Sequence, residues 1–206
     1  MIRPLLWPLL AAFSLAVAPV SAQDNSLEKQ AKKLHALAGG EMCEPLENAG
    51  EMDGSYESWT FSYTPELGGQ VDDEEITLIR IWCMSGAYNV LHAYYTYRAY
   101  EGLMPLSFAV PNIRTPEDTE ESRSADFGGV ELLGMDGTTI LTNSEFDPET
   151  RNITEHSLWR GVGDASSSGL WAFNDGEWTL VVYEVDASYD GEVNPHAIVD
   201  YRSGED

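Results

Sequence analysis

The chain has 206 residues, of which 35 are acidic and 11 basic, so its formal net charge is −24 at pH 7. Nucleic acid and anionic membrane surfaces both need a basic face, so this composition argues against both as partners. Cationic ligands, metal ions and basic proteins are compatible with the charge, and so is a purely solubilising role for it.

The first 22 residues predict an export signal. One arginine precedes an apolar segment over residues 5–18, and Val20-Ser21-Ala22 resembles a signal-peptidase cleavage site. The alternative is a membrane anchor, but the apolar run is short for a bilayer and Pro8 interrupts it. Cleavage would leave residues 23–206, which we expect to form one exported domain.

An amphipathic helix is predicted over residues 25–38. Leu27, Ala31 and Leu34 recur at helical spacing. Asn25 and Glu28 fit a capping box, and the glycine pair after residue 38 predicts the end of the helix.

The two cysteines, Cys43 and Cys83, stand 83 − 43 = 40 residues apart. An even count in an exported chain predicts one disulfide, which would tie the segment after the helix to a strand. Two free buried thiols are the alternative, and thiol titration with and without reductant separates the two.

The rest of the chain alternates strand patterns with turn residues. We expect strands over residues 57–64, 76–83, 89–100, 106–110, 129–133, 138–142, 152–159, 170–173, 178–185 and 196–201. Asp136-Gly137 and Asp175-Gly176 each predict a hairpin between neighbouring strands. The pattern favours a mainly β, antiparallel sandwich, or two packed β lobes, with one N-terminal helix.

One face of the strand predicted over residues 89–100 is a candidate surface for a small-molecule ligand. His92, Tyr94, Arg98 and Tyr100 share this face, and aromatic side chains with a few polar groups suit ligand contact. The alternative is an ordinary amphipathic strand that covers a second layer of the fold.

Two further motifs carry a family resemblance. Arg160-Gly161-Val162-Gly163-Asp164 predicts a sharp corner, because paired glycines allow positive φ, and Arg160 with Asp164 is a candidate ion pair across it. Together with Trp171-Ala172-Phe173, and with an upstream strand that ends in Cys83 before Gly86-Ala87-Tyr88-Asn89, the corner resembles a family of bacterial envelope proteins, domain of unknown function family eleven-seventy-six.

The resemblance covers about residues 76–191. It implies secretion to the periplasm, with no established activity and no catalytic residues to carry over. Many members have a cysteine after the Gly-Asp pair, whereas this chain has Ala165, so the resemblance implies no disulfide at the corner. Whether the Arg160–Asp164 corner has a functional or a structural role stays open.

A calcium site is a weaker hypothesis. Asp186, Ser188, Asp190 and Asn194 provide oxygen donors at the first, third, fifth and ninth positions of a calcium-like loop. Ala197 stands where such a loop has its bidentate glutamate, so an acidic turn is the alternative.

The sequence predicts no catalytic residue. The four histidines lie in separate predicted elements, with no spacing typical of metal ligands. The function favoured is a non-catalytic envelope binding or interaction module without a cofactor, whose partner is a small molecule or an envelope protein. The alternatives are a calcium-stabilised structural domain and a hydrolase that uses Ser166, Ser167 or Ser168 with His156 and Asp164.

Overall fold

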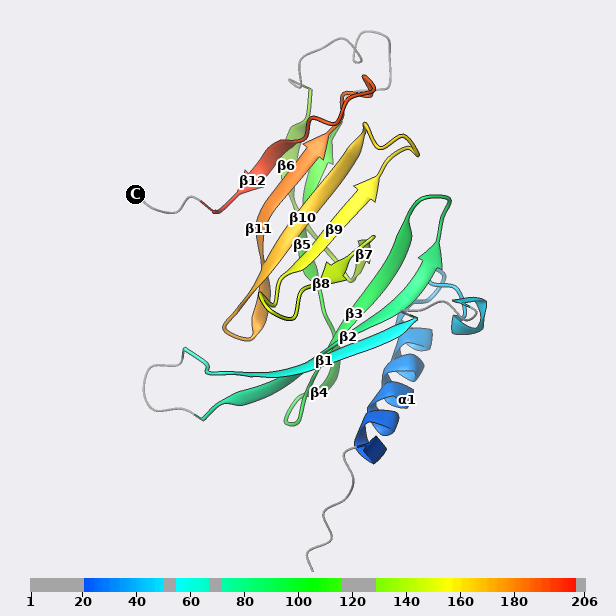
Figure 1. The fold of residues 1–206 in the computed structure, drawn as a ribbon, viewed down its shortest axis with the longest axis vertical. Coiled ribbons are helices and arrows are strands. Elements are labelled where there is room, and N and C mark those ends of the chain that lie inside the picture. Colours follow the sequence, from blue (N-terminus) through cyan, green and yellow to red (C-terminus); the bar gives the residue numbers. More distant parts are fainter. Residues whose placement is uncertain (1–20, 50–54, 67–71, 116–128, 203–206) are drawn as a thin grey trace, which may run out of the picture.

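The computed structural model describes residues 21–49, 55–66, 72–115 and 129–202. The predicted export signal lies outside these ranges up to residue 20. The elements, labelled in Figure 1, are α1 (Ser21–Ala38), the 3-10 helix η1 (Leu46–Ala49), β1 (Tyr56–Tyr63), β2 (Glu74–Ser85), β3 (Val90–Arg98), β4 (Gly102–Pro105), β5 (Phe108–Arg114), β6 (Glu131–Thr138), β7 (Ile140–Thr142), β8 (Glu145–Phe146), β9 (Ile153–Leu158), β10 (Ser166–Asn174), β11 (Glu177–Asp186) and β12 (His196–Asp200).

Among the described residues the strands form two five-stranded sheets and one two-stranded ribbon, all antiparallel where they pair. The helix-side sheet has the order β1-β2-β3-β4, with β7 also paired to β3. The second sheet has the order β12-β11-β10-β9-β8, and β5 pairs with β6 in the ribbon. The mainly β, antiparallel fold with one N-terminal helix is thus confirmed.

Strand β2 explains the layering, because both of its faces are buried. Ile76 and Leu78 point into the core shared with the second sheet. Ile79 and Ile81 point the other way, to a smaller core with Ala31 of α1. An unbroken run of β-branched and apolar residues is typical of such a two-sided strand, since neither face needs polar residues. Figure 1 shows α1 against the helix-side sheet.

The core between the sheets is rich in aromatic side chains. Trp59, Phe61 and Tyr63 alternate along β1 and pack against this core. Phe61 meets Phe173 of the second sheet edge-on, with the ring centroids 5.0 Å apart. Large rings in tilted and T-shaped contacts fill the wide gap between two twisted sheets.

The helix starts earlier than predicted, at Ser21 rather than at Asn25. No glycine or proline stands in residues 21–24, so nothing interrupts the backbone hydrogen bonds there. No helix among the described residues is long and apolar enough to cross a membrane.

The strand predicted over residues 89–100 was too long. Strand β3 ends at Arg98, and Gly102, with φ of 81°, helps to turn the chain into β4. The strand predicted before Pro111 runs through that proline instead, as β5. Since β5 pairs on one side only, it tolerates a residue without an N–H group.

The hairpin predicted at Asp136-Gly137 was wrong. Both residues lie inside β6, opposite Val110 and Ala109 of β5. Asp136 accepts a hydrogen bond of 2.8 Å from the side chain of Asn112. A two-residue hairpin turn of this kind needs positive φ, which neither residue has. Asp175 and Gly176, with φ of 48° and 89°, do form the second predicted hairpin.

Candidate functional site

The two family motifs meet at one corner of the sandwich, although about 70 residues separate them in the sequence. Tyr88, before β3, and Gly161, after β9, touch: a Cβ atom on Gly161 would lie 3.3 Å from the Tyr88 ring. The Tyr88 hydroxyl donates a hydrogen bond of 3.3 Å to the carbonyl oxygen of Trp159. We call Tyr88, Asn89 and residues 160–164 the motif corner.

Asn89 joins the helix-side sheet to the second sheet through its side-chain amide. Its Nδ2 donates to the Leu158 carbonyl at 2.8 Å, and its Oδ1 accepts from the Leu158 N–H at 3.1 Å. The amide therefore pairs with the end of β9 much as a neighbouring strand would.

Asn143 completes this connection. Its backbone has φ of 43°, a left-handed conformation that asparagine adopts more readily than most residues. Its side chain donates to Asn89 Oδ1 and to the His156 carbonyl, both at 2.9 Å, and accepts from the Val90 N–H at 2.8 Å. The two asparagines fix the positions of β3 and β9 relative to each other.

The predicted ion pair of Arg160 and Asp164 is present. Arg160 Nε donates to Asp164 Oδ1 at 2.5 Å, and Arg160 Nη2 binds the other carboxylate oxygen. Asp164 is 1% exposed and also accepts from the Gly191 N–H at 2.7 Å. The hydrogen bonds from Arg160 lower the pKa of Asp164 to about 2, against a smaller opposing effect of burial.

The same pair anchors the loop after β11. Arg160 donates to the Tyr189 carbonyl at 2.9 Å, and its guanidinium lies 5.2 Å from the centre of the Tyr189 ring. Gly163 has φ of 81°, as the glycine pattern predicted, and Gly161 does not need positive φ. Above this fixed base Val162 is 75% exposed and Tyr88 43% exposed.

The candidate ligand face of β3 lies mostly between the two sheets. Tyr94 is fully buried and packs against Phe108 with ring centroids 5.3 Å apart. Arg98 is also buried and donates to Glu101 at 2.8 Å and to the Gly176 carbonyl. Tyr100 lies beyond the end of β3, in the exposed turn before β4. The four side chains therefore do not share one open surface.

His92 belongs to a polar cluster in the same layer. Its Nδ1 lies 3.4 Å from Ser144 Oγ, which also accepts from the Tyr94 hydroxyl at 2.9 Å. Arg80 donates to the Ser144 carbonyl and forms an ion pair with Glu57. Burial, and secondly the charge of Arg80, lower the pKa of His92 to about 4, so the imidazole is neutral at pH 7.

In the calcium-like loop, groups of the loop itself donate hydrogen bonds to the Asp186 carboxylate. Asp186 is fully buried and accepts from the Ser188 N–H and hydroxyl and from the Asn194 N–H, at 2.7–3.1 Å. Asp190 accepts from the Glu192 N–H at 2.8 Å. In the described part of the chain no three His, Cys, Asp or Glu side chains gather as metal ligands would.

Ser166, Ser167 and Ser168 form the start of β10, and Ser166 and Ser167 are buried. Ser168 stands directly opposite His156 in the register of β9 and β10. Asp164 is engaged elsewhere, by Arg160 and Gly191. The predicted Ser/His/Asp set is therefore brought together only in part.

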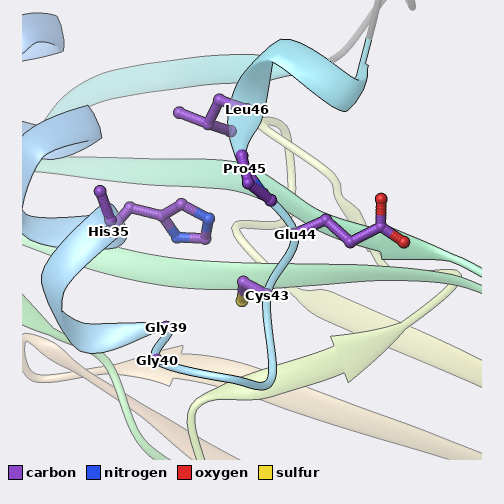
Figure 2. A pocket seen from close by; sticks show the side chains of 8 residues that line it. His35, Gly39, Gly40, Cys43, Glu44, Pro45 and Leu46 are labelled. Atoms are coloured by element: carbon purple, nitrogen blue, oxygen red, sulfur yellow. The ribbon is translucent and has the colours of Figure 1, made fainter.

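The Cys43–Cys83 disulfide is confirmed, with the two Cα atoms 4.4 Å apart. A pocket of about 180 Å³ lies beside it, at the end of α1, and Figure 2 shows its lining. Buried His35 forms part of the wall, with Nδ1 3.0 Å from the Tyr95 hydroxyl. Sequence reasoning missed this residue, although His35 follows buried Ala31 by one helical turn and so lies on the inner side of α1.

The comparison with protein-family models agrees with the resemblance that the motifs carry. A family model described as "Protein of unknown function (DUF1176)" matches residues 16–192, a longer stretch than the one that contains the motifs. No curated protein and no solved structure matches this chain.

Proposed function

This chain belongs to the DUF1176 family, and we propose that it is a non-catalytic binding module of the bacterial cell envelope that contacts a partner protein through the motif corner. An export signal over the first 22 residues would bring the chain to the periplasm, where disulfides persist. The Cys43–Cys83 bond is consistent with that location.

The observation that carries this proposal is the meeting of the two family motifs in space. Tyr88 and Asn89 come from one sheet, and residues 160–164 connect strands of the other. Hydrogen bonds, and an ion pair between partly exposed Arg160 and buried Asp164, hold the base of the corner. Its tip presents Val162 and part of Tyr88 to solvent.

An exposed apolar tip on a rigid base suits protein recognition. A side chain that is already fixed loses little conformational entropy on binding, so more of the contact energy appears as affinity. Aromatic residues such as Tyr88 also provide a large apolar contact with a polar end and are enriched where proteins bind each other.

Photo-crosslinking in the native host tests this proposal. We expect a photoreactive amino acid at position 162 to give a discrete adduct with one envelope protein. The same amino acid at position 37 is the control and should give no such adduct. Leu37 is 74% exposed, about as much as Val162, but it lies on α1 and not at the motif corner. Tyr88→Ala should abolish the adduct from position 162 while circular dichroism stays unchanged. Equal adducts from both positions, or none from position 162, would contradict the proposal.

A further inference from the structure

Strand β1 is a free edge of the helix-side sheet and shares no residue with the motif corner. It pairs with β2 along eight residues, in one continuous register from Tyr56 opposite Ile81 to Tyr63 opposite Glu74. No other described strand pairs with β1. In Figure 1 it runs along the front of the sheet, and no labelled element covers it. An edge strand presents a row of backbone N–H and C=O groups to which a further strand can bind.

Several other described edges carry features that hinder strand addition. Strand β4 has four residues and ends at Pro105, and β8 has two residues. The pairing of β12 with β11 and that of β6 with β5 are each interrupted by a shift of register. Strand β1 has no such shift and contains no glycine, proline or lysine, and its one charged residue, Glu57, forms an ion pair with Arg80 of β2. It therefore lacks most of the features by which proteins protect an open edge.

The outward backbone groups of β1 include those of Ser58, Thr60 and Ser62. The Trp82 N–H donates to the Ser55 carbonyl oxygen at 3.1 Å, so Ser55 and every second residue after it bond to β2. The residues between them direct their N–H and C=O groups away from the sheet. Ser58, Thr60 and Ser62 are exposed, and no described residue bonds to these backbone groups. The edge therefore offers both donors and acceptors to a partner strand.

The same edge presents aromatic side chains and a cation. Trp59 and Phe61 lie on the face of β1 toward the second sheet but are only half-buried. The guanidinium of Arg151 lies 4.7 Å from the centre of the Phe61 ring. No described carboxylate forms an ion pair with Arg151, although the chain has 35 acidic residues. An acidic side chain of a partner strand beside Phe61 would therefore gain an ion pair.

We propose that β1 pairs in antiparallel orientation with β1 of a second copy of this chain, about a two-fold axis beside Trp59. Ser58 of each copy then faces Thr60 of the other, and their outward N–H and C=O groups exchange hydrogen bonds. The two Trp59 side chains face each other in a non-hydrogen-bonded pair, where cross-strand side chains come closest and aromatic pairs stabilise a sheet. The two helix-side sheets join into one.

Charge complementarity selects this occupant and this register. Glu57 is the one charged residue of β1. With Trp59 opposite Trp59, Glu57 faces Phe61 of the other copy, which lies beside an arginine without an ion pair. The two-fold axis repeats this contact, as in every interface of this symmetry. A shift of the register by two residues would place Glu57 opposite Trp59 or Tyr63 instead, away from the cation.

Sedimentation velocity of the disulfide-bonded protein, at concentrations from about 1 to 300 µM, tests the proposal. In sodium chloride of about 0.15 M the screening length is about 8 Å, so repulsion between the two acidic copies is short-ranged. We expect a reversible equilibrium between monomer and dimer. Monomer alone throughout this range would overturn the proposal.

Two variants at one position assign the dimer to the outward backbone of β1. Thr60→Pro removes an N–H group that β2 does not use, and it should weaken dimerisation about tenfold or more, because the two-fold axis doubles the loss. Thr60→Val is the matched control, since it keeps the N–H group and also loses the hydroxyl contact with Thr77. It should dimerise as the wild type does, and equal dimerisation of the two variants would contradict the proposal.

A pair of arginine variants provides the test if Thr60→Pro does not fold. Arg151→Gln should weaken dimerisation by about three- to tenfold, because two ion pairs per dimer are lost. Arg114→Gln removes the same charge from β5, where Arg114 pairs with Glu131 of its own chain, and should leave dimerisation unchanged. Equal association constants of these two variants would rule out the proposed register.

Photo-crosslinking in the native host separates a second copy from any other occupant of the edge. A photoreactive amino acid at position 60 should give an adduct of two copies of the chain. Adducts with a different protein alone would overturn the proposal, because β1 would then receive a strand from another partner.

Discussion

Asp164 decides the geometry of the motif corner at the scale of a single residue. Its buried carboxylate accepts from Arg160 and from the Gly191 N–H, so it ties the corner to the loop after β11. A buried carboxylate without such donors would be strongly unfavourable. The Arg160–Asp164 pair thus has at least a structural role, which keeps Val162 exposed above it.

We expect Asp164→Asn to lower the free energy of unfolding at pH 7 by about 2 kcal/mol, because charge-assisted hydrogen bonds in a buried site are lost. The folded pKa of about 2 lies below that of an unfolded aspartate, which is about 3.9. The contribution is therefore complete above about pH 4 and is lost as the pH falls toward 2.

Urea unfolding at pH 7, 4 and 2 measures this effect. The difference between wild type and variant should be largest at pH 7 and shrink toward pH 2. Asp190→Asn is the matched control, since Asp190 is exposed and accepts from one N–H in the same loop region. A pH-independent difference would mean that Asp164 does not act through its charge.

At the scale of an element, β10 is shaped by a glycine under an aromatic ring. The Trp171 ring folds back over Gly169, so that a Cβ atom there would lie 2.7 Å from Trp171 Cζ3 and 3.1 Å from the Tyr183 ring. The ring is fully buried, and its Nε1 donates to the Ala109 carbonyl of β5 at 2.9 Å. The glycine therefore allows one side chain to connect the second sheet with the β5–β6 ribbon.

Gly169→Ala should destabilise the protein by about 2–3 kcal/mol, because the ring cannot move without losing its core contacts and its hydrogen bond. Gly134→Ala in β6 is the control, since nothing lies within 4 Å of a Cβ atom there, and its effect should stay within about 0.5 kcal/mol. Equal thermal midpoints of the two variants would show that the Trp171 ring can adjust.

At the scale of the whole molecule, α1 is attached on the side of the fold away from the inter-sheet core. Its apolar face meets Ile79, Ile81 and Tyr95 in a small core of its own. The Cys43–Cys83 bond joins the loop after α1 to β2. Burial of this small core stabilises the packing of α1 only a little. The disulfide therefore contributes a large part of the free energy that keeps α1 on the sheet.

Replacing both cysteines by alanine should lower the free energy of unfolding by about 4 kcal/mol, the loop-entropy estimate for a 40-residue closure. Hydrogen exchange should become faster in α1 and change little in β9–β11. Reductant should affect the wild type and leave the double variant unchanged. Uniform acceleration over both sheets would instead mean that the disulfide stabilises the whole sandwich.

Local chemistry was enough to predict several features of this protein. Alternation along β1, the two-sided apolar run of β2 and the Asp175-Gly176 hairpin each follow from interactions between residues close in sequence. The pairing of Cys43 with Cys83 follows from their number, and family membership from two motifs.

The tertiary structure decided the rest, because one local pattern can satisfy two different folds. Asp136-Gly137 is compatible with a turn, yet pairing with β5 makes it part of a strand. The His92–Tyr94 face would suit a ligand, yet the second sheet and β5 cover Tyr94. The motif corner and the His35 pocket are formed by segments far apart in the chain, and no local rule brings such segments together.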